Sequence, residues 1–216
     1  MKNLQSMFYT LVMLLGLTSA SNAASMNGIY LEVGSSAAGV AIDGSATDTG
    51  SNSTTVGSVG KTAVIANYGL GYMTDRSNKM GLDLGYLITP GEAKISRTSD
   101  GTGSDVTFEI SDTTEYYLAP MINISEDASL YLKFGWNSSD VKTTGDVTKI
   151  SSMDGETVAL GTVMSWGTNL YIRSEAGMTE YDTITGKGLG NTIGTDEVVT
   201  ASPEVYYGKI AIGYKF

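Results

Sequence analysis

The nine residues from Gly208 to Phe216, GKIAIGYKF, alternate between two kinds of side chain. Every second residue counted back from the aromatic end is apolar or small, namely Phe216, Tyr214, Ile212, Ile210 and Gly208. The residues between them are lysine, alanine and glycine. Because successive side chains of a β-strand point to opposite faces, this stretch predicts a strand with one apolar face and one small or polar face.

The same alternation in steps of two runs through the rest of the chain. No helical period persists for more than a few residues outside the N-terminal segment. Eight segments carry an apolar stripe, and each is close to the length of a tilted membrane strand, typically about 9 to 11 residues. The predicted strands cover residues 28–35, 62–73, 79–88, 114–124, 129–137, 158–166, 170–179 and 205–216.

The connections between these segments alternate in length. Three are short and rich in turn-forming residues, at 74–77, 125–128 and 167–169. The other four are long and polar, at 36–61, 89–113, 138–157 and 180–204. Short turns at one end and long loops at the other are typical of membrane barrels. The sequence therefore predicts an all-β, eight-stranded antiparallel transmembrane up-and-down β-barrel with short periplasmic turns and long extracellular loops.

Charged residues inside the segments fall on the face opposite the apolar stripe. A stripe that faces lipid requires this, because one Lys or Arg there costs about 2 to 4 kcal/mol near the bilayer midplane. Four acids and four bases on the inward face can neutralise each other by ion pairing in a narrow lumen. A soluble β-sandwich with the stripe as its core is the alternative, because alternation alone does not separate the two. The predicted lumen polar network is Glu32, Asp83, Glu115, Lys133, Arg173, Glu175, Lys209 and Lys215, with Tyr117 and Tyr131 beside it.

Aromatic residues on the stripes gather at two depths. Rings that are apolar in body and polar at one edge favour both membrane interfaces, so this sorting predicts two aromatic girdles. A sandwich core has no need of such sorting. With the first strand running outward from the periplasm, the residues are Tyr72, Trp166, Tyr214 and Phe216 at the short-turn end and Tyr86, Tyr116, Trp136 and Tyr206 at the long-loop end.

Composition narrows the classes of function. The 216 residues carry a formal charge of -10, which repels a nucleic-acid backbone. Without cysteine or histidine, the chain has no disulfide, no thiolate or imidazole metal site and no His-based catalysis. The glycine-rich stretch 186–194 lacks the ending of a phosphate-binding loop, and the acids near Asp43 and Asp100 do not match a calcium loop. We therefore expect no catalytic residue, cofactor or dedicated metal site.

Residues 1–23 have the pattern of a secretory signal peptide. Lys2 precedes an apolar block from Phe8 to Leu17, which is about half the length that a membrane-spanning helix needs. Small residues close the segment, and the triplet ending at Ala23 places the cleavage after that residue. We expect export and a single mature barrel domain over residues 24–216.

The GKIAIGYKF stretch resembles the C-terminal assembly signal of Gram-negative outer-membrane barrel proteins, which the outer-membrane insertion machinery reads. GLDLGY at 81–86 and ASLYLKFGW at 128–136 are similar to the third and fifth strands of small eight-stranded barrels of the opacity-protein and OmpA/OmpX-like group. The resemblance implies location in the cell outer membrane, among outer-membrane lipid and lipopolysaccharide, and contact with the insertion machinery. The assembly-signal residues would be Gly208, Ile210, Ile212, Tyr214 and Phe216.

An eight-stranded barrel has an interior that side chains fill, so no wide pore is expected. The expected function is that of a non-enzymatic outer-membrane protein whose surface loops serve envelope integrity, adhesion or another surface interaction, with an extracellular ligand that the sequence leaves open. A narrow porin-like channel for small solutes is the alternative. A binder or transporter of small apolar ligands comes third, because it needs an apolar upper lumen that the inward residues of the eight segments do not provide.

Overall fold

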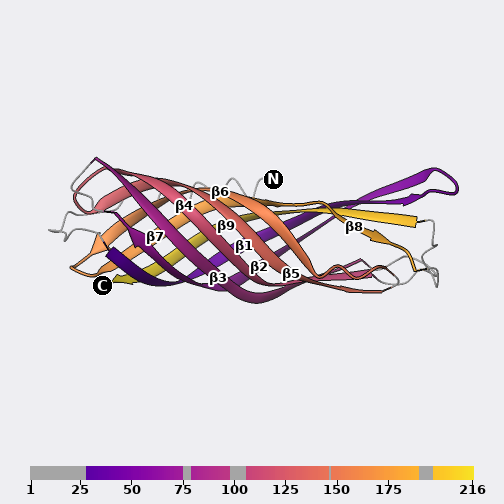
Figure 1. Cartoon of the computed structure of the whole chain (residues 1–216), viewed down its shortest axis with the longest axis horizontal. Coiled ribbons are helices and arrows are strands. Elements are labelled where there is room, and N and C mark those ends of the chain that lie inside the picture. The colour runs from indigo at the N-terminus through magenta and orange to yellow at the C-terminus, as the bar shows by residue number, and fades with distance from the viewer. Residues whose placement is uncertain (1–27, 75–78, 98–105, 146, 190–196) are drawn as a thin grey trace.

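Nine β-strands form one antiparallel sheet in the computed structural model, which describes residues 28–74, 79–97, 106–145, 147–189 and 197–216. They are β1 (Gly28–Asp48), β2 (Ser53–Met73), β3 (Met80–Arg97), β4 (Val106–Asn123), β5 (Ala128–Thr144), β6 (Ser152–Trp166), β7 (Leu170–Tyr181), β8 (Ile184–Lys187) and β9 (Glu197–Lys215). Eight strands form a ring that β1 and β9 close, while the short β8 pairs with the outer part of β9 (Figure 1). The expected all-β eight-stranded antiparallel barrel is confirmed. Within the described ranges, no helix has the length and hydropathy needed to cross a membrane.

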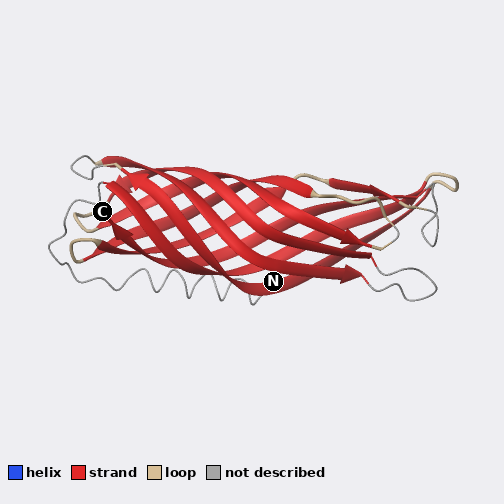
Figure 2. Ribbon diagram, turned by 60° about the horizontal axis from the view of Figure 1, so that its bottom comes forward, coloured by secondary structure: helices blue, strands red, loops and turns tan. Residues whose placement is uncertain are grey.

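The strands are strongly tilted (Figure 2). A path through directly paired residues that leaves β1 at Leu31 crosses the other seven strands of the ring and returns to β1 at Ala41, ten residues further along. With about 3.3 Å of rise per residue and about 4.8 Å between strands, this offset corresponds to a tilt of roughly 40° and a radius of about 8 Å. The path runs through Leu31, Leu70, Tyr86, Tyr116, Trp136, Glu156, Glu180, Glu204 and Ala41.

The two faces of the barrel wall carry opposite chemistry. Along β5 every odd-numbered residue from Ser129 to Val141 is buried and every even-numbered one is exposed. The exposed set on this strand begins with Leu130, Leu132, Phe134 and Trp136, whereas the buried set includes a lysine. A water-soluble protein would show the reverse, so the apolar outer wall is the face that hydrocarbon solvates.

The predicted long polar loops are wrong in one respect, because strands continue through most of them. β1 and β2 pair without a break through the predicted 36–61 connection, from Gly28↔Met73 to Asp48↔Ser53. In Figure 1 this hairpin reaches beyond the described ends of the other strands. β3, β4, β5, β6 and β9 likewise extend into the other three connections, and β8 lies inside the fourth. Residues 98–105 and 190–196 lie outside the described ranges.

Asp48 fixes the turn at the far end of β1 and β2. Its carboxylate accepts hydrogen bonds from the Ser51 hydroxyl at 2.7 Å and from the Gly50 N–H at 2.8 Å. These bonds, led by the one from Ser51, lower the pKa of Asp48 below its ordinary value. Asn52 takes a positive φ of 54°, which asparagine tolerates better than most residues. The hairpin therefore ends in a defined turn.

The pairing between β2 and β3 stops before the end of the barrel that lies opposite the short turns. Pairing between these strands runs from Met73↔Asp83 only to Tyr68↔Ile88. Pro90 follows, which has no N–H to donate, and Gly91 has a φ of 150°. The part of β2 at 53–67 therefore pairs with β1 along one edge, while no described strand pairs with its other edge.

Candidate functional site

The barrel lumen holds a polar layer of acidic and basic side chains. Seven charged side chains point inward and are at most 5% exposed, and Lys215 at the short-turn end is 9% exposed. The structure thus places all eight residues of the predicted lumen network inside the barrel. The seven are Glu32, Asp83, Glu115, Lys133, Arg173, Glu175 and Lys209.

Arg173 on β7 is the centre of this layer. Its Nη2 donates to Asp83 Oδ2 at 2.7 Å, and its Nη1 donates to the Tyr117 hydroxyl at 3.3 Å. Its Nε lies 2.9 Å from Glu32 Oε2, an ionic contact in which the N–H is not aligned for a hydrogen bond. A guanidinium suits this position because it is planar, remains charged and presents donors in several directions. Arg173 thereby joins β1, β3 and β4 to β7 across the lumen.

Two lysines complete the layer. Lys133 Nζ lies 2.7 Å from Glu175 Oε1 and 3.0 Å from Glu115 Oε1. Lys209 Nζ lies 3.1 Å from Glu32 Oε1, so Glu32 is shared between this ammonium and the guanidinium of Arg173. Paired in this way, the charges avoid the cost of several kcal/mol that an isolated buried ion would carry.

Four tyrosines fill the space around these charges, and each lies against a glycine directly opposite on a neighbouring strand. A Cβ atom added to any of these glycines would come within 2.0 to 2.4 Å of Cζ of the tyrosine ring. The ring therefore occupies the volume that the missing side chain leaves, which is a known way to stabilise glycine in a sheet. The pairs are Tyr30 with Gly71, Tyr117 with Gly85, Tyr131 with Gly161 and Tyr171 with Gly213.

The tyrosine hydroxyls also hydrogen-bond to the carboxylates. Tyr30 donates to Asp83 Oδ1 at 2.8 Å and also contacts the Tyr117 hydroxyl. Tyr131 donates to Glu175 at 2.6 Å, and Tyr171 donates to Glu32 at 3.0 Å. The predicted network did not include Tyr30 or Tyr171. Their inward parity is readable from the sequence, but their glycine and carboxylate partners follow only from the strand register.

Above the charged layer, the lumen becomes neutral. Asn137 donates to Thr157 at 2.6 Å, and Thr157 shares a hydrogen bond with Thr179 at 2.6 Å. Beyond them lies a buried apolar cluster to which β8 and the 145–151 connection contribute. The expectation that no apolar upper lumen exists is wrong, because the strands continue inward-facing apolar residues past the predicted segment ends. The cluster is Ile110, Val141, Met153 and Tyr181, with Ile150, Ile184 and Val205 packed against it.

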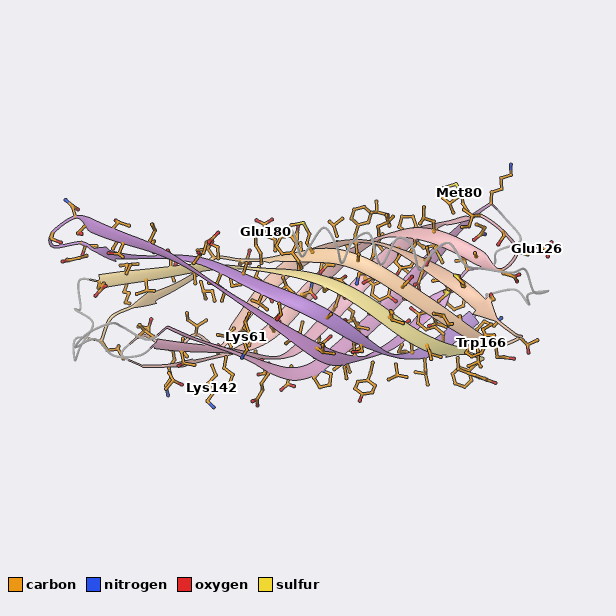
Figure 3. The ribbon with its side chains drawn as sticks, turned by 180° about the vertical axis from the view of Figure 1, so that it is seen from behind. Lys61, Met80, Glu126, Lys142, Trp166 and Glu180 are labelled. Atoms are coloured by element: carbon orange, nitrogen blue, oxygen red, sulfur yellow. The ribbon has the colours of Figure 1, made fainter. Side chains whose placement is uncertain are left out.

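The aromatic residues of the predicted girdles lie on the outer wall. Figure 3 shows Trp166 at the short-turn end, together with Met80 and Glu126. Tyr72 is also exposed there, whereas Tyr116, Trp136 and Tyr206 are exposed toward the opposite end. Tyr86 is half-buried, because its ring packs against Tyr116 with 4.7 Å between the centroids.

The predicted assembly signal covers the last residues of β9 and Phe216, which follows the strand. Its apolar residues Ile210, Ile212, Tyr214 and Phe216 are all exposed on the outer wall, and Gly208 is half-buried. The backbone N–H of Phe216 donates to the carbonyl of Ile29 at 3.0 Å, which ties the end of the chain to β1.

Other stretches considered for chemistry lie partly outside the described residues. Asp100 and residues 190–194 of the glycine-rich stretch are outside, whereas Gly186 and Lys187 belong to β8, and Asp43 lies on β1. Within the described part of the chain, no group of three or more acidic side chains is placed to hold a metal ion.

Comparison with known proteins identifies the architecture. No protein-family model and no curated protein matches the chain. The outer membrane protein OprG from Pseudomonas aeruginosa is similar over 89% of this chain and 98% of its own, with a TM-score of 0.50 and 16% identity. Neisserial surface protein A (NspA) covers 88% of this chain and 97% of its own, with a TM-score of 0.45 and 13% identity. Ail of Yersinia pestis covers 85% of this chain and 99% of its own, with a TM-score of 0.42 and 16% identity. The likeness to OprG shows the fold, that of the small outer-membrane β-barrels.

Proposed function

We propose that this chain is a non-enzymatic integral protein of the outer membrane that acts at the cell surface through its extracellular β-sheet. The lumen is closed to solutes, and the barrel serves as a membrane platform surrounded by outer-membrane lipid and lipopolysaccharide. One observation carries the proposal: the strands β1, β2 and β9 continue as a paired sheet well past the charged layer that fills the lumen. No catalytic residue, cofactor, metal or nucleic acid takes part in this function.

The ion pairs support a closed lumen rather than a narrow channel. Arg173, Lys133 and Lys209 each contact a carboxylate within 3.1 Å, and the tyrosine rings fill the space between them. An eight-stranded barrel of about 8 Å radius leaves little volume that side chains do not fill. A conducting path would require several of these buried contacts to break together.

Shortening the β1–β2 hairpin tests the role of the extracellular sheet. Residues 44–57 are replaced by Asn-Gly, which joins the directly opposite Asp43 and Ser58 in a two-residue turn. We expect the variant to keep heat-modifiable migration on SDS gels, because the wall within the membrane is unchanged. Attachment of expressing cells to matrix-coated plates should fall at least tenfold, to the level of a vector-only strain. Attachment equal to wild type would overturn the surface role.

Conductance measurements on the purified wild type and the shortened variant test whether the lumen is closed. Wild type and the shortened variant should both show no steady unit conductance in planar bilayers, with a general porin as positive control. A steady conductance that disappears when Arg173 and Lys133 are changed would instead establish the channel.

A second candidate function, binding of small apolar ligands, is favoured by the apolar cluster in the upper lumen. Ile110, Val141 and Met153 are each less than 9% exposed there. Saturable binding of an apolar fluorescent probe to the protein reconstituted in liposomes, lost in Ile110→Asn, would favour this candidate over the surface role.

We also propose that the last strand is the assembly signal read by the insertion machinery, after export by the signal peptide at 1–23, which lies outside the described residues. Replacing Phe216 by Ala should lower the amount of folded protein in outer-membrane fractions about tenfold in cells. Refolding of the purified variant into detergent should change little, because Phe216 is 69% exposed. Equal losses in cells and in detergent would mean that Phe216 acts through stability alone.

A further inference from the structure

A groove of about 800 Å³ lies on the outer wall of the barrel, across β4, β5, β6 and β7. Its position is set by Trp136, which belongs to the predicted outer aromatic girdle, and by Glu156 directly opposite on the next strand. The groove therefore begins where the apolar belt ends, at the level of the lipid headgroups. The lining residues that matter here are Tyr116, Trp136, Val158, Met178, Glu156 and Glu180.

A row of directly paired residues on neighbouring strands passes through the groove, and it changes from aromatic to acidic halfway. Its first three members are aromatic and its last three are glutamates, each residue directly opposite the next. Tyr116 and Trp136 are 66% and 51% exposed, so both side chains are accessible from outside. The row is Tyr86, Tyr116, Trp136, Glu156, Glu180 and Glu204.

The glutamates repel one another, and no lysine or arginine among the described residues forms an ion pair with them. Like charges directly opposite each other on adjacent strands are destabilising. Asp154 and Asp182 add two carboxylates to the same groove, where the N–H of Asp182 donates to the Asp154 carbonyl at 2.8 Å. None of the ion pairs among the described residues includes these groups. The groove thus has a negative rim.

The floor of the groove is apolar. Val158 and Met178 lie side by side on β6 and β7 as direct partners, and they are 47% and 37% exposed. A hydrated inorganic cation would gain nothing from this floor. An alkyl or aryl group would bury apolar surface there, at about 25 cal/mol per Å².

We propose that the groove binds an amphiphile with a cationic ammonium head and an apolar body. The head lies against Glu156 and Glu180 and over the face of Trp136, where carboxylates and an aromatic ring both attract a cation. The apolar body lies on Val158 and Met178 and points toward the membrane. Ligand binding also relieves the repulsion between the two glutamates. This activity is additional to the surface role proposed above.

Tryptophan fluorescence provides a direct test. The chain has two tryptophans, and Trp166 lies near the short-turn end, whereas Glu180 lies near the middle of the molecule's length (Figure 3). In a Trp166→Phe protein, Trp136 is therefore the sole reporter. In dodecyl maltoside micelles, which carry no ammonium group, this protein should show a saturable fluorescence change with octyltrimethylammonium. Octyl glucoside and octyl sulfate, with the same alkyl chain, should give only the linear change of partitioning.

Charge variants separate binding from partitioning. The double variant Glu156→Gln, Glu180→Gln should bind octyltrimethylammonium at least tenfold more weakly, whereas Glu126→Gln at the short-turn end should bind as wild type. Heat-modifiable migration on SDS gels checks that each variant is folded. Equal responses to the three amphiphiles, or unchanged affinity in the double variant, would overturn the proposal. Binding of octyl sulfate that requires Mg²⁺ would also overturn it, since the groove would then hold an anionic head through a metal ion.

A lipid amine and a free amphiphile share this chemistry. Micelles that contain phosphatidylethanolamine distinguish the two sources. Competition by the lipid amine would identify a membrane lipid as the occupant, and full affinity in its presence would identify an amphiphile from the surrounding water. The preference for a cationic head supports the site in both cases.

Discussion

Replacing Arg173 by methionine is expected to destabilise the barrel by about 3 to 5 kcal/mol, because removing one partner of a buried ion network leaves the others uncompensated. Asp83 loses the guanidinium that lies 2.7 Å from its Oδ2, and Glu32 keeps Lys209 as its one basic partner among the described residues. Both acids are fully buried or nearly so, so water cannot replace the lost contacts. Urea unfolding in lipid vesicles, followed by tryptophan fluorescence, measures the effect.

Two further variants locate the cause of that loss. Adding Asp83→Asn to Arg173→Met should restore part of the stability, because it removes a buried charge that has lost its partner. Lys142→Gln is the matched control at a surface pair, where the lysine is 73% exposed and lies 3.9 Å from Glu109. Its effect should stay within about 1 kcal/mol. If Arg173→Met were as mild as Lys142→Gln, the lumen network would not be what holds the strands together.

Replacing Gly213 by alanine is expected to cost about 3 kcal/mol or more, although only one methyl group is added. The new Cβ would lie 2.0 Å from Cζ of Tyr171, so the ring must move. Overpacking of this kind typically costs about 1 to 3 kcal/mol. The displaced ring would also lose the hydrogen bond from its hydroxyl to Glu32 at 3.0 Å, and a hydrogen bond to a charged group contributes about 1.5 to 3 kcal/mol.

Gly208 on the same strand supplies the control for Gly213. No heavy atom lies within 4 Å of the position that a Cβ would take at Gly208, so alanine there should change the stability by no more than about 0.5 kcal/mol. The midpoint of urea unfolding distinguishes the two variants. Similar midpoints would show that the Tyr171 ring moves freely and that the pairing of tyrosine with glycine is not a packing constraint.

The sequence predicted the membrane part of the fold because lipid imposes a strict rule on alternate residues. A charge on the apolar side of a segment would be costly, so the positions of Glu32 or Lys133 also define which neighbours face outward. The eight strands of the ring and their antiparallel order follow from that rule together with the turn lengths. The outward extensions were missed because no lipid contacts them. In GSSAAGVAIDGSATD, at 34–48, small and polar residues satisfy both faces of a strand, and the alternation weakens.

The partners inside the lumen needed three-dimensional information. Arg173 and Asp83 are 90 residues apart, and only closure of the ring brings β7 and β3 to opposite sides of one narrow space. The sequence assigned both residues to the inner face but gave no basis for choosing Asp83 over another acid as a partner. The end of β2–β3 pairing has a local cause in Pro90 and Gly91, and these two residues were the available signal for it.

The uninterrupted pairing of β1 has a mechanical consequence. From Ala37, near the top of the apolar belt, to the turn at Asp48, eleven residues at about 3.3 Å each give roughly 35 Å of strand with backbone bonds to both β2 and β9. A ribbon bonded along both sides resists bending far more than a tethered coil of the same contour length. A partner bound at its tip would be held at a fixed distance from the bilayer. A force applied to the tip would act on the hydrogen bonds between β1 and β9, which close the barrel.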